Sequence, residues 1–431
     1  MNRSTVASFF PPWAGSFFVA AFLLSYPTVT LVVHGGASAV SIAAALVGLC
    51  VLALPRASEP PRVDRIVVVT LVALASPLAA TLVSEAWHGK FVASLLDAPS
   101  RFLLAIPILL ALRRVRVGLL RWSDLSFALG AIAALLVLLL TPREPNSRWA
   151  SPFLDAIHFG DIALVLGALS ALSLNWWKKD RLPIKALKLV ALATGIYASV
   201  LTETRGGWVA IPVVALLVYL RGSHRRDGRR WLVPLSIVAA LILIGATSHM
   251  VRDRVWLIWS DLVQYSHGYK DTSTGVRLQL YEAAFSILRE HLVFGAGPNG
   301  FADSMAAFAK AGQVSPLAAD YGRGETHNQL LFYAANYGMI GALAGLALHV
   351  APCIMFARYM NAPTREARCA AFMGLTFTVC FFIFGLSVET FDLKMAASFY
   401  AAVIGILGAI ATSAPAVLAG NRGAASSTCG T

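Results

Sequence analysis

Charged side chains are scarce in this sequence of 431 residues. Asp, Glu, Lys and Arg make up 13% of the chain, about half their share in ordinary soluble domains, which excludes a soluble globular enzyme. The high apolar content excludes a disordered chain, and the lack of a Gly-X-Y period excludes a collagen-like fibre. The five cysteines show no Cys-x-x-Cys spacing, so neither a disulfide framework nor a zinc site is indicated.

Apolar residues dominate instead, at 58% of the chain, with a mean hydropathy of +0.69. A helix that spans a membrane needs about 20 such residues. The apolar runs lie near 13–33, 36–54, 66–83, 91–112, 125–141, 157–175, 186–202, 207–220, 231–247, 329–357, 369–388 and 396–412. We therefore predict an all-α, polytopic integral membrane protein with about twelve transmembrane helices.

The longest gap between these runs predicts one large loop outside the membrane. Apolar residues recur at helical spacing within it and predict an amphipathic helix over 276–291. The expected organisation is transmembrane helices 1–9 in residues 1–247, the large loop in 248–326, transmembrane helices 10–12 in 327–412 and a tail in 413–431.

Basic residues are concentrated on one side of the predicted bundle. An even number of spans puts both termini on the same side, where most Lys and Arg lie, in segments such as 113–121, 178–188 and 221–230. By the positive-inside rule this side is cytoplasmic, and the large loop faces outward. The net charge of +13 therefore follows the topology and predicts contact with anionic membrane lipids rather than a nucleic-acid partner.

His327 is the strongest candidate for chemistry. It opens the tenth span, followed by Asn328, where a polar group is either a solvated cap or part of a site. Helical spacing puts Gly338 on the same face, and Gly341 with Gly345 forms a GxxxG pattern that predicts close packing against another helix. His327 would then point into the bundle, and an imidazole can take a proton from a hydroxyl near neutral pH. The alternative is a histidine that only caps the helix.

Arginines at the outer ends of spans are candidates for binding a phosphate group. In the turn after the seventh span stand Arg205, Gly206, Gly207 and Trp208. This turn is so short that the seventh and eighth spans must form a tight hairpin, and glycines let a backbone approach a ligand. Arg277 on the amphipathic helix and Arg101 after Pro99 and Ser100 are further outer cations. The alternative is that each pairs with an outer acid such as Glu203 or Glu282.

Two patterns are set aside. Residues 295–300 satisfy GxGxxG, but no strand precedes them and no βαβ unit surrounds them, so they predict a turn rather than a nucleotide site. The outer acids show no Asp-x-Asp or His-Glu-x-x-His spacing, so we expect neither a metal nor any other cofactor. These acids are Asp155, Asp161, Glu203, Glu389 and Asp392.

A longer motif begins at the histidine. His327-Asn328, nine residues, Gly338, two residues and Gly341 fit the pattern H-[NSQ]-x9-G-x-x-[GTY]. In this motif the chain resembles the superfamily of O-antigen ligases, O-antigen polymerases and bacterial O-oligosaccharyltransferases. The predicted spans, the large loop before the tenth of them and the Arg-Gly-Gly turn agree with it. The topological resemblance extends over nearly the whole chain, and the recognisable motifs lie between about 201 and 341. Because no large outer domain follows the last span, the chain looks most like the lipopolysaccharide O-antigen ligases.

The resemblance implies a GT-C-like membrane glycosyltransferase acting at the periplasmic face of the bacterial inner membrane, with cytoplasmic termini. The implied donor is a glycan on undecaprenyl pyrophosphate, and the implied acceptor is a sugar hydroxyl of lipid A-core. By position, His327 matches the essential histidine of the family, Arg205 the arginine of the short turn and Arg277 the arginine early in the loop helix. Arg101 matches less closely, through Pro-Ser-Arg and an apolar run alone.

These assignments lead to a mechanistic hypothesis. The diphosphate leaves with its charge on phosphate oxygens, which Arg205 and Arg277 would stabilise. His327 would deprotonate or orient the acceptor hydroxyl, with inversion at the anomeric carbon and without a metal ion. We expect Arg101, Asn328, Gly206, Gly207 and Trp208 to contribute to substrate binding.

Two rival functions stay open from the sequence. A polymerase of the same family would differ only in using another lipid-linked glycan as the acceptor. A transporter of the lipid-linked glycan would place polar groups near the middle of the membrane, whereas the candidates here lie at the outer edge.

Overall fold

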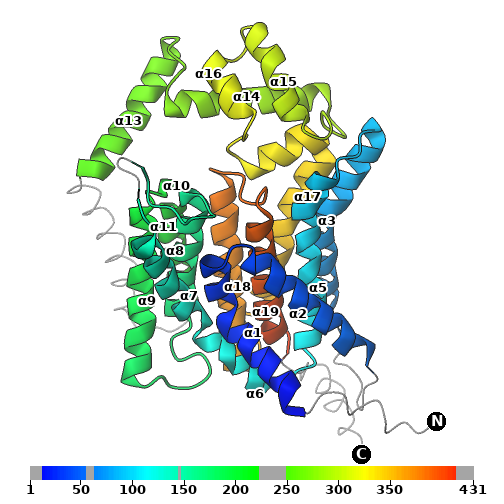
Figure 1. Cartoon of the computed structure of the whole chain (residues 1–431), viewed down its shortest axis with the longest axis vertical. Helices are drawn as coiled ribbons and strands as arrows, with labels where there is room; N and C mark the ends of the chain where they lie inside the picture. The colour runs from blue at the N-terminus through cyan, green and yellow to red at the C-terminus, as the bar shows by residue number, and fades with distance from the viewer. Residues whose placement is uncertain (1–11, 55–62, 144–146, 223–248, 414–431) are drawn as a thin grey trace, which may run out of the picture.

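The computed structural model describes residues 12–54, 63–143, 147–222 and 249–413 (Figure 1). Within these ranges every regular element is a helix, and no strand occurs. The predicted all-α class is therefore confirmed for the described chain.

The first helices are α1 (Pro12–Val32), α2 (Gly36–Ala53), α3 (Arg65–His88), η1 (Ala93–Leu96), α4 (Asp97–Ser100), η2 (Arg101–Leu104), α5 (Ala105–Leu112), α6 (Val117–Leu120), η3 (Arg121–Asp124) and α7 (Ser126–Leu140). They are followed by α8 (Ala156–Leu172), α9 (Leu182–Leu201), α10 (Arg205–Trp208), α11 (Ala210–Gly222), α13 (His249–Ser266), α14 (Ser273–Glu290), α15 (Gly300–Lys310) and α16 (Pro316–Gly322). The last three are α17 (Gln329–Tyr359), α18 (Arg365–Gly385) and α19 (Lys394–Ala411).

The protein is an integral membrane protein. Nine helical stretches among the described residues are long and apolar enough to cross a membrane. Two shorter apolar stretches, Ala156–Leu172 and Gly206–Arg221, occupy the positions of the predicted sixth and eighth spans. The predicted ninth span, 231–247, lies outside the described residues.

α19 lies at the centre of the bundle. In its span 89% of the residues are buried, against 28% in the spans of α1, α2 and α9. Small residues allow the close packing: a Cβ atom on Gly405 or Gly408 would meet Ile108 or Leu109 of α5 at 2.9 Å. The loop that joins α19 to α18 therefore connects two well-buried helices, and it carries several of the groups described below.

Helices α13 to α16, residues 249–322, which we call the cap, lie at one end of the bundle (Figure 1). The predicted amphipathic helix is confirmed as α14, whose buried residues pack with those of α15 and α16 in one apolar cluster. The cap rests on α3, where the Ser84 hydroxyl donates to the Phe294 carbonyl at 2.9 Å and Trp87 stacks on Phe294 at 4.3 Å. Residues 295–299 form the predicted turn, and α15 begins at Gly300.

Candidate active site

His327 lies in the connection between the cap and α17. Its backbone is left-handed (φ 57°), and α17 begins only at Gln329. Asn328 is the N-cap, because its Oδ1 accepts the N–H groups of Leu330 and Leu331 at 3.0 and 3.1 Å. Both predicted placements of His327, on the helix face shared with later glycines and as the helix cap, are therefore wrong. The imidazole stands on a short turn ahead of the helix.

Gly338 interrupts α17 with φ 66° and ψ −156°, a conformation essentially restricted to glycine. On one side of the break the carbonyl groups of Ala335 and Asn336 accept N–H groups of the 296–297 turn at 2.9 and 3.0 Å. On the other side the Met339 N–H donates to the loop after α14 at 2.8 Å. The motif glycine thus joins α17 to the cap through backbone hydrogen bonds that a continuous helix would not offer.

The glycines of the GxxxG pattern face the first half of α17. A Cβ atom on Gly341 would meet the Tyr333 carbonyl oxygen at 2.5 Å, and one on Gly345 would meet the Tyr333 ring at 2.5 Å. The predicted close packing is therefore observed, but the partner is the helical segment before the break at Gly338 rather than a separate span. The helical period behind it does not continue through Gly338, where the chain changes direction.

The His327 imidazole is paired with a carboxylate. Its Nδ1 atom lies 3.3 Å from Oε2 of Glu325, and the two side chains are 18% and 28% exposed. Burial alone would raise the pKa of Glu325, but its contact with His327 brings that pKa below the usual value. A carboxylate beside Nδ1 favours a proton on that nitrogen, which leaves Nε2 as the atom able to accept another.

Glu389, from the loop between α18 and α19, fixes the residue before His327. Its Oε1 accepts both the N–H and the hydroxyl of Thr326, and its own N–H donates to Glu325 Oε1 at 2.9 Å. Its side chain is buried, and this burial raises the pKa of Glu389 to about 8 although the Thr326 hydrogen bonds oppose the rise. Glu389 is therefore mainly protonated at neutral pH.

Replacing Glu389 with Gln should flatten the pH dependence of stability. The folded protein holds the Glu389 proton up to about pH 8, whereas an unfolded chain releases it near 4.3. Between these values the folded state binds more protons, so the free energy of unfolding falls as the pH rises. Thermal unfolding in detergent at about pH 5 and about pH 8.5 measures this loss. We expect a smaller loss in Glu389→Gln than in the wild type, and equal losses would contradict the assignment.

Arg277 lies one turn before Tyr281 on α14, and Tyr281 contacts the turn that bears His327. The Tyr281 hydroxyl donates to the His327 carbonyl at 3.1 Å. Burial raises the pKa of Tyr281, and the charge of Arg277 opposes the rise. The guanidinium of Arg277 is therefore close enough to affect the Tyr281 hydroxyl, which contacts the His327 turn. Arg277 is partly buried and makes no ion pair with a carboxylate in the described chain, and Glu282 instead accepts the hydroxyl of Tyr265. Its positive charge is uncompensated there.

The hairpin turn between α9 and α11 is as short as predicted, and Arg205 begins the short helix α10 within it. The two helices do not pair tightly, because α9 packs mainly against α7 and α8 and α11 against α18, so this part of the prediction is wrong. The side chain of Arg205 lies outside the described part of the structure. A Cβ atom on Gly206 would collide with the Ser387 hydroxyl, and one on Gly207 with a carboxylate of α8. The described contacts of these glycines are thus with the protein itself. The Trp208 indole N–H likewise donates inside the hairpin, to a serine of α9 at 3.3 Å.

The turn Leu386–Ser387, directly after α18, is the meeting point of these segments. The Leu386 carbonyl accepts the Tyr281 hydroxyl at 3.4 Å and the side-chain amide of Asn328 at 3.3 Å. Ser387 lies against Gly206 of the hairpin. The structure therefore brings together the backbone of the Arg205 hairpin, the Arg277 helix and the His327 turn, although they are far apart in the sequence.

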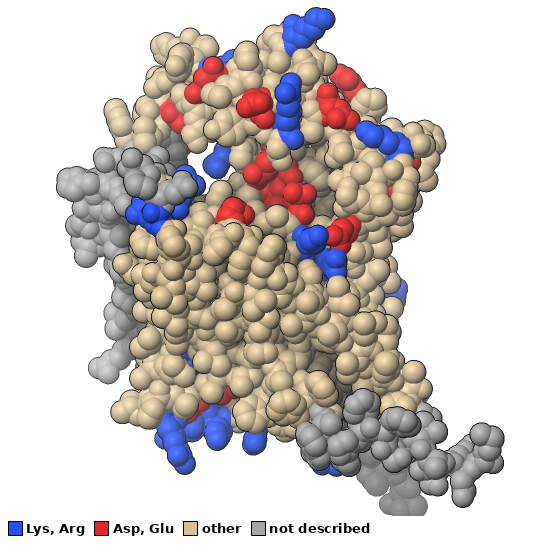
Figure 2. Space-filling model, viewed as in Figure 1, with Lys and Arg blue, Asp and Glu red and all other residues tan. Residues whose placement is uncertain are grey.

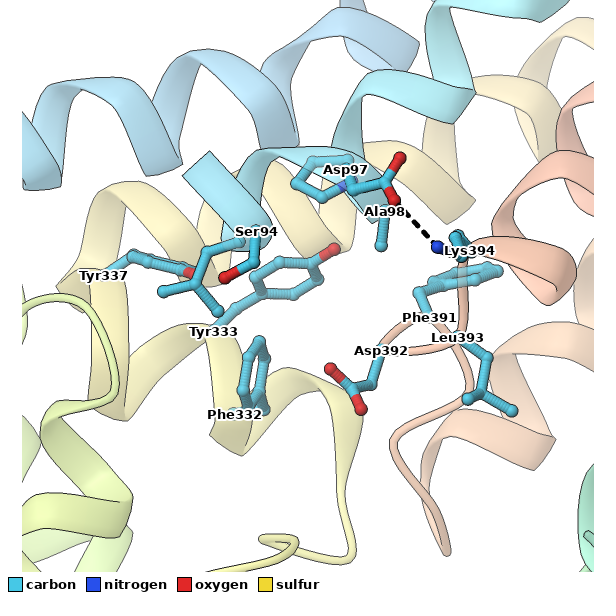
Figure 3. A pocket seen from close by; sticks show the side chains of 12 residues that line it. Ser94, Asp97, Ala98, Phe332, Tyr333, Tyr337, Phe391, Asp392, Leu393 and Lys394 are labelled. Carbon is cyan, nitrogen blue, oxygen red and sulfur yellow. Dashed lines mark hydrogen bonds and ion pairs between the residues drawn. The ribbon is translucent and has the colours of Figure 1, made fainter. Parts of the chain in front are cut away.

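Arg101 belongs to a different group of charges. Its guanidinium pairs with Asp97, whose second oxygen lies 3.2 Å from Lys394 Nζ (Figure 3). For Arg101 the alternative of pairing with an outer acid is the one observed. It is not among the residues that meet at the Leu386–Ser387 turn.

Sequence reasoning missed Tyr281 and Glu325. Tyr281 follows Arg277 by four residues, so helical spacing places both on one face of the predicted helix. Glu325 precedes His327 by two residues, a spacing that makes no contact in a helix or a strand. Only the left-handed backbone of His327 turns the imidazole back towards Glu325.

In the ranges that the structure describes, no three His, Cys, Asp or Glu side chains are grouped so that they could hold a metal ion. The expectation of a metal-independent site stays a prediction, and we test it below with a chelator.

Part of the chain is similar to known proteins. Residues 189–346 match a family model described as O-antigen ligase, and this segment contains Arg205, Arg277 and His327. An uncharacterized protein of Haemophilus influenzae is 24% identical over 286 residues, which cover 65% of this chain and 70% of that relative.

Proposed function

The chain belongs to the O-antigen ligase family, and from this premise we propose that it moves a glycan from undecaprenyl pyrophosphate to a sugar hydroxyl of lipid A-core. The family supports a membrane glycosyltransferase of the ligase or polymerase type. The observation that supports the finer assignment best is the arrangement around Tyr281. It holds a carboxylate-paired imidazole, His327, near an arginine whose charge is uncompensated, Arg277.

The transfer takes place in one displacement. His327 Nε2 accepts the proton of the acceptor hydroxyl, and the hydroxyl oxygen forms a bond to the anomeric carbon of the donor. The bond from that carbon to the diphosphate oxygen breaks, and its electron pair leaves on the diphosphate. Glu325 stabilises the imidazolium that forms, because its carboxylate lies beside Nδ1.

The leaving diphosphate requires positive charge in a site poor in water. Arg277 supplies it from α14, and Arg205 is the second candidate, because its hairpin packs against the turn that contacts Tyr281 and Asn328. Asn328 caps the N-terminus of α17 and thereby fixes the position of the preceding residue, His327.

We further propose that the site faces the periplasm, with the protein in the bacterial inner membrane and its termini cytoplasmic. The domain division proposed with it is nine spans in 1–247, the periplasmic loop in 248–326, three spans in 327–412 and a cytoplasmic tail in 413–431. The charge distribution supports this orientation, since the basic segments 113–121 and 178–188 lie at the end of the bundle opposite the cap (Figure 1).

Arg277→Ala should lower the transfer rate at saturating acceptor by roughly 10²–10³-fold, the range for loss of one group that stabilises developing negative charge. Arg277→Lys should recover part of the rate, because lysine keeps the positive charge but lacks the planar guanidinium that can donate two parallel hydrogen bonds. The matched control is Arg289→Ala, at the exposed end of the same helix. If Arg277→Ala and Arg289→Ala transfer equally fast, Arg277 has no role in the reaction.

The deciding experiment uses detergent-purified protein, a lipid-linked glycan and lipid A-core, with no membrane gradient. An enzyme of the proposed kind adds the mass of the glycan to the core. A polymerase instead lengthens the lipid-linked glycan, and a transporter changes the mass of neither substrate. Either of these results would replace our assignment.

The same assay tests metal independence. We expect full activity in excess EDTA, because arginine side chains rather than a metal ion stabilise the diphosphate. Loss of activity on chelation with recovery on adding Mg²⁺ would show that the leaving group needs a metal ion.

A further inference from the structure

A cavity of about 290 Å³ lies between α4, the first half of α17 and the start of α19 (Figure 3). The loop between α18 and α19, which lines part of this cavity, is hydrogen-bonded to residues on either side of His327. The Phe391 N–H donates to Gln329 Oε1 at 2.6 Å, and Glu389 holds Thr326 through its carboxylate. The cavity is therefore built onto the turn that presents the imidazole. Its volume is at the small end for ligand sites and suits one ring rather than a long glycan.

One side of the cavity is aromatic. Phe332 and Tyr333 line it five and six residues after His327, with their rings at 64° and 5.7 Å apart. Tyr333 is 3% exposed, and its hydroxyl makes no hydrogen bond within the described chain. A buried tyrosine hydroxyl normally has a partner, and Figure 3 shows this one directed towards the side of the cavity formed by Asp97 and Ala98.

The opposite side is acidic. Asp97 is neutralised by Arg101 and Lys394, but Asp392 makes no ion pair in the part of the chain that the structure describes, and its carboxylate faces the cavity (Figure 3). Asp392 is exposed to the cavity, and partial desolvation raises its pKa, which the charge of His158 opposes and that of Glu325 reinforces. This carboxylate is therefore within electrostatic range of the Glu325–His327 pair. Acidic side chains also gather in the hollow between the cap and the bundle in Figure 2.

We propose that this cavity is the subsite for the terminal sugar of the acceptor, and that it selects a neutral ring with free hydroxyl groups. This inference rests on the proposed function. A pyranose has hydroxyl groups around its rim and C–H groups on its faces. Phe332 and Tyr333 offer apolar surface to the C–H groups, whereas Asp392 accepts hydrogen bonds from the hydroxyl groups.

Charge assigns the cavity to the acceptor rather than to the donor. An unpaired carboxylate repels a diphosphate, which the cations Arg277 and Arg205 attract on the α14 and α10 side of His327. Asp392 also disfavours an acceptor sugar that carries a phosphate or carboxylate group beside the reacting hydroxyl.

The test measures the KM values for acceptor and donor separately in the purified protein. Asp392→Asn keeps the shape of the cavity but replaces the charged carboxylate with a neutral amide, which accepts weaker hydrogen bonds. Ala98→Phe places a large side chain in the cavity from a residue that lines it. We expect each variant to raise the KM for lipid A-core about tenfold or more and to leave the KM for the lipid-linked glycan within about twofold. Asp271→Asn, on an exposed loop of the cap, is the matched control and should change neither value.

An unchanged acceptor KM in both variants, or an equal rise in the donor KM, would overturn the subsite while leaving the transfer reaction intact. Absence of transfer by the wild type would count against the proposed function only. Binding of lipid-free core oligosaccharide to the His327→Ala protein then tests the cavity without any reaction. A Kd about tenfold weaker after adding Asp392→Asn supports the subsite, and an equal Kd overturns it.

Discussion

His327→Ala is expected to lower the rate of glycan transfer by about 10²–10⁴-fold, the usual contribution of a general base, while the protein stays folded. The side chain contacts Glu325 but does not cap α17, since Asn328 supplies that cap. Because His327 has a left-handed backbone, we add His327→Asn, as asparagine adopts this conformation readily. Both variants should be inactive in the mass assay and should unfold within a few degrees of the wild type.

The control for this substitution is His267→Ala, which removes an exposed imidazole from the cap and should keep full activity. Transfer at the wild-type rate by either His327 variant would remove the imidazole from the mechanism. If His327→Ala fails to fold but His327→Asn folds, the failure is caused by strain in the left-handed backbone at this position. The transfer rate of the asparagine variant would then decide whether the imidazole is needed for the reaction.

Gly338→Ala is expected to lower the free energy of unfolding by about 1–3 kcal/mol from backbone strain alone and to reduce transfer severely. The added Cβ atom would collide with the Val293 carbonyl, and the φ and ψ angles at this position are open essentially to glycine alone. Either the α17 break straightens or the loop after α14 moves away. In both cases the turn that bears His327 shifts relative to Arg277.

Thermal unfolding in detergent and the transfer assay measure the two effects of Gly338→Ala. The matched control is Gly324→Ala, between the cap and α17, where the nearest atom to the added Cβ would be 3.5 Å away. This control should be close to the wild type in both measurements. A Gly338→Ala protein that is as stable and as active as Gly324→Ala would show that the break in α17 is not needed.

Much of the fold follows from local patterns in the sequence. Apolar length predicted nine stretches of the described chain that are long enough to span a membrane, the apolar spacing over 276–291 predicted α14, and the few residues between two apolar runs predicted the short turn at Arg205. These features depend only on neighbours in the chain. They are correct because burial in a membrane and helix amphipathicity need no knowledge of distant partners.

The site was harder to predict because it depends on single backbone angles and on distant contacts. The helical period was extended from His327 through Gly338, but left-handed residues at both positions end it. Arg101 pairs with Asp97, one helical turn before it, but the second partner of Asp97 is Lys394 of α19, nearly 300 residues away in the sequence. The sequence indicates Glu389 only as a possible metal ligand, whereas its carboxylate accepts hydrogen bonds from the backbone and side chain of Thr326.

The stereochemistry of the product tests the central claim most directly. A direct attack assisted by His327, with the diphosphate leaving from the opposite face, must invert the configuration at the anomeric carbon. The anomeric coupling constant of the new linkage, measured by NMR on the glycosylated core and compared with that of the lipid-linked donor, should therefore change from one anomer to the other. Retention of the donor configuration would require an intermediate step on the protein and would contradict the mechanism proposed for His327 and Arg277.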